Sequence, residues 1–197
     1  MKIRLMILAS ALAMTGSISI AQTNSVTPGT VGERKEKQQD RIANGIDSGQ
    51  LTAGETKNLE GREANLNRNE RQMRAADGGK LTAADRTALN RQENRISGQI
   101  YQDKHNARTA TYGKGEIGQR RENQQDRIAQ GIRSGQMTPG EASRQERRER
   151  GLNREVAGMR QQNGGTLTPG ERNLVNRQQN RQSRQIYREK HNARTGH

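Results

Sequence analysis

The chain has 197 residues, with 35 Lys and Arg against 21 Asp and Glu, so its formal net charge is +14. Only 27% of the residues are hydrophobic and 2% are aromatic, and Cys, Trp and Phe are absent. This composition excludes disulfide bonds, cysteine nucleophiles and zinc sites built on thiolates. It also predicts a thin hydrophobic core, because highly charged chains with few large aliphatic residues bury little apolar surface.

Residues 1–21 have the pattern of a signal peptide. Two basic residues open the segment, 5–14 is almost entirely apolar, and small residues lead up to Ala21, as they do before signal-peptidase cleavage. The apolar run is too short to span a bilayer comfortably. We expect cleavage after Ala21, a flexible lead-in over 22–32, and a periplasmic or secreted protein without a transmembrane segment.

The rest of the chain consists of two tandem copies of one sequence unit. Residues 38–109 align without gaps on 124–195, and 42 of these 72 positions are identical. Equivalent residues in the first copy and the second copy therefore differ by 86 in number. A duplication of this kind predicts two similar structural units, so we expect helical repeats over 33–109 and 117–197, joined by a linker over 110–116.

Each copy contains two junctions with the same chemistry: a Gly, then a Thr three residues later, then an acid three residues after the Thr. The Gly suits the left-handed position that ends a helix. The Thr suits an N-cap, and the acid completes a capping box. The glycines are Gly49, Gly79, Gly135 and Gly165, and the threonines are Thr52, Thr82, Thr138 and Thr168. The pattern predicts an all-α fold of two tandem three-helix repeats with helices over roughly 33–47, 53–77, 83–104, 119–133, 139–163 and 169–190.

The same junctions resemble the second half of an EF-hand calcium loop, and the chain as a whole resembles small exported bacterial repeat proteins. In EF-hands the Gly makes the turn, an apolar residue joins the loop to a second loop through a short β-bridge, and the last acid coordinates calcium. The resemblance therefore implies paired loops within each copy and leaves a calcium-responsive module as an alternative. No loop has an acid at its first, third or fifth position, and in two loops the first position is an arginine, Arg74 or Arg160. These loops are degenerate, and their surviving half is equally well explained by helix capping.

Arginines that share a helix face are the candidate binding residues. In each copy, two arginines four residues apart lie on one face of the third expected helix, and the second copy adds a dense basic stretch over 144–155. A guanidinium group holds phosphate or carboxylate oxygens by forked hydrogen bonds. The six candidate anion-binding residues are Arg91, Arg95, Arg147, Arg148, Arg177 and Arg181.

The positive charge is concentrated in the second copy. Residues 31–109 hold 15 basic and 12 acidic residues, whereas 117–195 hold 17 basic and 8 acidic residues. A basic helical surface attracts polyanions, and export makes anionic envelope polymers or lipid headgroups the expected partners. Export and the scarcity of aromatic residues argue against nucleic acid as the partner in vivo, although a polyanion binder that orders on binding stays open as an alternative.

The sequence offers little support for catalysis. His105 and His191 lie in matching polar tails without carboxylate or histidine partners nearby, so we expect exposed helix ends. Two carboxylate pairs are present: Glu60 with Glu63, and Glu146 with Glu149. Arginines flank both pairs, which favours salt-bridged helix surface over acid–base chemistry. We therefore expect a non-enzymatic binding or structural module without catalytic, cofactor or metal sites.

Overall fold

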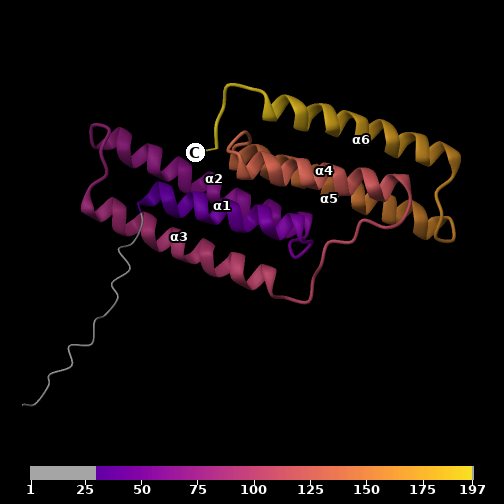
Figure 1. Cartoon of the computed structure of the whole chain (residues 1–197), viewed down its shortest axis with the longest axis horizontal. Helices are drawn as coiled ribbons and strands as arrows, with labels where there is room; N and C mark the ends of the chain where they lie inside the picture. The colour runs from indigo at the N-terminus through magenta and orange to yellow at the C-terminus, as the bar shows by residue number, and fades with distance from the viewer. Residues whose placement is uncertain (1–29, 197) are drawn as a thin grey trace, which may run out of the picture.

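The computed structural model describes residues 30–196, which form an all-α fold as expected (Figure 1). The six helices are α1 (Val31–Asp47), α2 (Ala53–Ala76), α3 (Ala83–Lys104), α4 (Glu116–Arg133), α5 (Pro139–Gln162) and α6 (Pro169–Lys190). No strand occurs between residues 30 and 196. None of the helices in this range is long and apolar enough to cross a membrane. The expected signal peptide and residues 22–29 of the lead-in lie outside the described residues.

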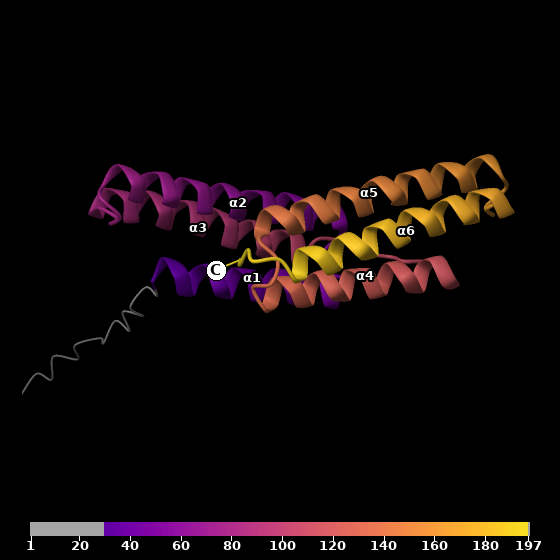
Figure 2. The same ribbon diagram turned by 90° about the horizontal axis from the view of Figure 1, so that it is seen from above.

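The helices form two sets of three, one from each copy, which overlap at the middle of an elongated molecule (Figure 1, Figure 2). The most extensive contact joins α2 to α5, and the next joins α1 to α4. Helix α3 packs on α1 and α2, and helix α6 packs on α4 and α5. The two third helices therefore form opposite outer edges, and the first two helices of each copy build the shared interior.

An approximate two-fold axis relates the copies. Ser143 Oγ donates a hydrogen bond to the carbonyl oxygen of Lys57 at 2.9 Å, and these two residues occupy equivalent positions. Asp47 and Arg133, which are also equivalent, form an ion pair. Residues at the start of α2 line a cavity together with residues late in α5, and residues at the start of α5 line another with residues late in α2. Equivalent residues that contact each other lie on or near a two-fold axis, so α2 and α5 run antiparallel across it.

The junction chemistry sets the helix ends as expected. Gly49 and Gly135 have φ angles of 68° and 66°, a region that residues with a Cβ adopt at a cost. The four junction threonines all accept a hydrogen bond from the N–H three residues later, and the acid there accepts from the threonine N–H. Each such box satisfies backbone donors that the first turn of a helix leaves unpaired.

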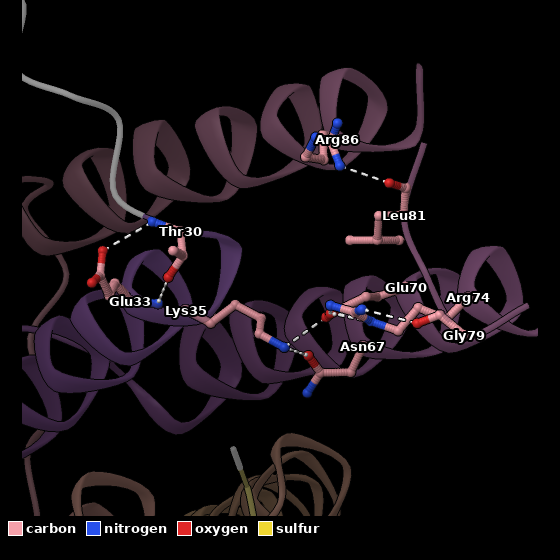
Figure 3. A network of polar contacts seen from close by, with 9 residues as sticks. All are labelled: Thr30, Glu33, Lys35, Asn67, Glu70, Arg74, Gly79, Leu81 and Arg86. Atoms are coloured by element: carbon pink, nitrogen blue, oxygen red, sulfur yellow. Dashed lines mark hydrogen bonds and ion pairs between the residues drawn. The ribbon is translucent and has the colours of Figure 1, made fainter. Parts of the chain in front are cut away.

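Two helices begin earlier than the sequence predicted. Helix α1 starts at Val31 because Thr30 and Glu33 form a further capping box, with Thr30 N–H donating to Glu33 Oε2 at 2.9 Å (Figure 3). Helix α4 starts at Glu116, directly after Gly115. The lead-in and the linker are therefore shorter than expected, since Val31, Gly32 and Glu116 are helical.

The hydrophobic core is shared between the copies. Ile42 and Ile46 of α1 belong to the same buried cluster as Ile128 and Ile132 of α4 and Ile186 of α6. Burying an aliphatic side chain of this size stabilises the fold by about 1.5–3 kcal/mol. A second, smaller cluster lies within the second copy and consists of Leu152, Val156, Leu167 and Val175. The larger cluster is therefore completed only when the two copies pack together.

The two carboxylate pairs are buried, so the expectation of exposed, salt-bridged surface is wrong. Glu60 and Glu146 are 0% exposed, and Glu63 and Glu149 are 1% exposed. Glu60 and Glu146 lie near each other where α2 packs on α5. Glu63 and Glu149 instead face the other helices of their own copy, with Glu93 near Glu63 and with Arg121 and Gln182 hydrogen-bonded to Glu149. Of the four, only Glu149 has an ion-pair partner within the described residues, Arg121 at 2.8 Å.

Candidate anion-binding site

The six arginines predicted as anion-binding residues are all exposed, and the structure brings two of them together. Arg148 of α5 and Arg181 of α6 line one groove between these helices, with a volume of about 370 Å³. Arg147 does not line this groove. Arg91 and Arg95 lie on α3, at the opposite outer edge of the molecule (Figure 1).

The face of α6 that carries Arg177 and Arg181 continues toward the helix end with Arg184 and Arg188. Spacings of four, three and four residues keep these side chains within one narrow sector of an α-helix. All four are exposed. They form a single row, the arginine stripe, which extends about 16 Å at 1.5 Å per residue.

A second groove lies between α4 and α6, beside the stripe. Its lining residues are Arg127, Ser183, Arg184, Tyr187 and Arg188, and its volume is about 480 Å³. Three of the five are arginines and none is acidic. This groove is called the basic groove, and Arg184 and Arg188 belong to both the groove and the stripe.

The arginines of the basic groove differ in how they are held. Arg127 donates a hydrogen bond to the carbonyl oxygen of Ser183 at 3.2 Å, which holds its side chain across the groove. Within residues 30–196, Arg127, Arg184 and Arg188 form no ion pair with a carboxylate. Burial and, to a lesser extent, the neighbouring charge of Arg127 lower the pKa of Lys190.

An aromatic pair adjoins the groove. Tyr187 is 58% exposed, and its ring stacks on His191 with centroids 4.1 Å apart. His191 Nδ1 lies 2.7 Å from the carbonyl oxygen of Tyr187. Tyr101 and His105 repeat this pair in the first copy. The prediction that both histidines lie at exposed helix ends is confirmed, and each tyrosine offers a flat ring face next to charged groups.

The equivalent groove of the first copy has a different charge pattern. It is lined by Arg34, Lys37, Asp40, Arg41 and Ser97, so it includes an acid. Gly98 and Gln102 stand where the second copy has Arg184 and Arg188. The two arginines that sequence reasoning missed are thus the ones that distinguish the copies, and a comparison of the copies along the α6 face would have found them.

The last acid of the first EF-hand-like loop in each copy caps the helix that follows. Glu55 and Glu141 accept the hydrogen bonds of their capping boxes. Each also accepts a hydrogen bond from an asparagine amide, Asn106 in the first copy and Asn192 in the second. Within residues 30–196, no three His, Cys, Asp or Glu side chains form a group that could hold a metal ion.

The expected pairing of the two loops in each copy is wrong, because the 24 residues of α2 or α5 separate them. The first loop of each copy instead receives a backbone hydrogen bond from the segment that follows the third helix. Ala110 N–H donates to the carbonyl oxygen of Gly49, and Gly196 N–H donates to that of Gly135, both at 2.8 Å. This contact joins the end of each copy to the loop between its first two helices.

No protein-family model, curated protein or solved structure matches this chain. Its function is therefore inferred from its own residues.

Proposed function

We propose that this chain is an exported, non-enzymatic helical protein whose second copy binds a linear anionic polymer of the bacterial envelope. The observation that supports this most directly is the basic groove with the arginine stripe along its edge. The paired N–H donors of a guanidinium group match two oxygens of a phosphate or carboxylate. No acidic residue lines the groove to compete for these donors.

A polymer suits the stripe better than a single small anion does. Four guanidinium groups follow one another at about 4.5–6 Å along the helix axis, so successive charges of an extended chain can engage successive arginines. One exposed contact of this kind contributes only about 1 kcal/mol. Four together contribute about 4 kcal/mol, or roughly a thousandfold in affinity, with a steep dependence on salt.

The location in the envelope rests on the amino-terminal sequence. A basic start, an apolar run of signal-peptide length and the small residues before Ala21 support export through a cleaved signal. Amino-terminal sequencing of the protein recovered from outside the cytoplasm should begin at Gln22. Recovery of the intact chain from the cytoplasm alone would contradict export.

Binding is tested with paired arginine variants. Arg184→Gln with Arg188→Gln removes the two arginines that are specific to the second copy. Affinity for long-chain polyphosphate and for polygalacturonate, measured by titration calorimetry, should fall about tenfold or more, because two contacts of about 1 kcal/mol each are lost. The slope of log affinity against log salt should become shallower.

The first copy supplies a control with the same loss of charge. Arg91→Gln with Arg95→Gln should weaken binding by less than threefold. In the reverse experiment, Gly98→Arg with Gln102→Arg extends the arginine row on α3 and should create a second binding site.

Three results would contradict the proposal: equal losses in both pairs of variants, binding that is insensitive to salt, or a preference for DNA or anionic vesicles over both polymers. Circular dichroism melts of each variant show whether the fold is kept.

A further inference from the structure

Two tyrosines are the large apolar side chains exposed within residues 30–196, and they occupy equivalent positions in the two copies. Tyr101 lies near the end of α3 and is 63% exposed, and Tyr187 lies near the end of α6 and is 58% exposed. A buried aromatic ring removes much apolar surface from water, so such rings are usually found in cores and interfaces. Neither tyrosine belongs to a hydrophobic cluster in the described part of the chain, so core packing does not account for them.

The ring of Tyr187 is held in place from one side. His191 stacks on it, with an angle of 25° between the two ring planes. The contact between His191 Nδ1 and the carbonyl oxygen of Tyr187 orients the imidazole. One face of the tyrosine ring is therefore covered, and the other is available to a ligand. A ring that is fixed before binding loses little conformational freedom when a ligand covers it.

The segment that follows each third helix leaves the tyrosine ring open. In the first copy, the linker and all of α4, α5 and α6 come after α3, and Tyr101 is still the more exposed of the two tyrosines. The chain runs from the third helix to the first loop of its own copy, where Ala110 and Gly196 form equivalent backbone hydrogen bonds. The exposure of Tyr187 therefore reflects a course of the chain that both copies share.

The two tyrosines differ in the charge around them. Tyr187 lines the basic groove together with the three arginines Arg127, Arg184 and Arg188. Arg184 lies three residues before Tyr187, which places both side chains on the same side of α6. The first copy has no arginine at the positions equivalent to Arg184 and Arg188. An exposed aromatic ring and a row of guanidinium groups are thus combined only in the second copy.

This combination suits a sugar ring that carries an acid group. The face of a pyranose ring presents C–H groups with partial positive charge, which the negative face of an aromatic ring attracts. The carboxylate of a uronic acid projects from the edge of its ring. When the sugar lies flat on Tyr187, the carboxylate is directed sideways, toward guanidinium groups that can hold both of its oxygens. Inorganic polyphosphate has charge but no ring, so it can use only the arginines.

We propose that the basic groove binds an acidic polysaccharide, with Tyr187 stacked on one sugar ring and with Arg127 and Arg184 holding its carboxylate. This inference rests on the function proposed above, because it concerns the same groove. Tyr187 is then the residue that distinguishes an acidic glycan from a polyanion without rings. Single-stranded nucleic acid also carries rings that stack on tyrosine, but the export proposed above favours the glycan.

Two substitutions separate the ring of Tyr187 from its hydroxyl group. Tyr187→Leu removes the ring and keeps an apolar side chain, whereas Tyr187→Phe keeps the ring. In titration calorimetry of the full chain, affinity for polygalacturonate should fall about fivefold with Tyr187→Leu and less than twofold with Tyr187→Phe. Affinity for long-chain polyphosphate should change less than twofold in both variants. Tyr101→Leu, the matched variant of the first copy, should change neither affinity by twofold.

Trigalacturonate reports on the stacking itself. Its ring protons should shift upfield in ¹H NMR when it binds the native chain or Tyr187→Phe, because they lie over an aromatic ring. The shift should be absent with Tyr187→Leu. A loss of affinity in Tyr187→Phe as large as that in Tyr187→Leu would assign the contact to the hydroxyl group and overturn the stacking.

Failure of the proposed function would give a different result. In that case Arg184→Gln with Arg188→Gln would leave the binding of both polymers unchanged. If that variant weakens both polymers but Tyr187→Leu weakens neither, or weakens both equally, the stacking is overturned and the function stands. Tighter binding of single-stranded DNA than of either polymer would overturn both. Tyr187 lies outside the core, so its variants should fold, which a circular dichroism melt verifies.

Discussion

Glu63 offers the sharpest test of the energetics of the buried carboxyl groups. Burial and the negative charge of Glu93 raise the pKa of Glu63 to about 8 from its ordinary value of 4.5, although Lys35 and Arg41 act in the opposite direction. Glu63 Oε1 is buried and has no hydrogen-bond partner in the described residues. The folded protein therefore keeps a proton on this carboxyl group at pH values where the unfolded chain has lost it.

The sign of the pH dependence follows from the raised pKa. Stability contributed by the protonated carboxyl is fully present below about pH 4.5 and is lost as pH rises through about 8. One pKa unit corresponds to about 1.4 kcal/mol. Between pH 5 and pH 8 the free energy of unfolding should thus fall by about 3 kcal/mol from Glu63 alone. Glu60 and Glu146, whose pKa values burial also raises, add to the fall.

The substitution Glu63→Gln removes this dependence. Urea unfolding of the full chain, followed by circular dichroism at pH 5, 6.5 and 8, should show the variant gaining about 3 kcal/mol over the native chain between the lowest and highest pH. Glu70→Gln is the control of opposite sign. Because hydrogen bonds lower the pKa of Glu70, its loss should reduce stability at pH 8. Parallel pH curves for Glu63→Gln and the native chain would refute the reasoning.

Three further substitutions probe the fold at separate places. Glu149→Gln should destabilise the protein by about 3 kcal/mol in urea unfolding, because it leaves the mostly buried Arg121 without its ion-pair partner; a loss under 0.5 kcal/mol would show that the pair contributes nothing. Asp47→Arg places two arginines on the approximate two-fold axis and should lower the free energy of unfolding by about 1 kcal/mol. Adding Arg133→Asp, which exchanges the two charges, should restore it. No rescue would show that the ion pair does not join the copies. Thr138→Ala removes an N-cap and should lower the free energy of unfolding by about 1 kcal/mol, and an unchanged value in the same assay would contradict the role of the capping box.

The helices and their ends were within reach of sequence reasoning because their signals are local. A Gly that turns the chain, a Thr that caps the next helix and an acid three residues later act within one turn of backbone. The gapless duplication carried the same pattern into the second copy. The exceptions were the starts at Val31 and Glu116. Thr30 and Glu33 repeat the Thr-to-acid spacing but have no junction glycine before them, and Gly115 forms no side-chain cap.

The contact between the copies was decided by tertiary structure alone. Periodicity along one helix shows which face is apolar, but it does not show that a second, polar face will also be covered. From the sequence alone, Glu60 and Glu146 were expected on an exposed helix surface. The antiparallel packing of α2 on α5 buries both. The basic groove has the same origin, because Arg127 comes from α4 and Arg184 from α6. Sequence thus determined the helices and their charges, whereas the two-fold packing determined which charges are buried and which lie together at the surface.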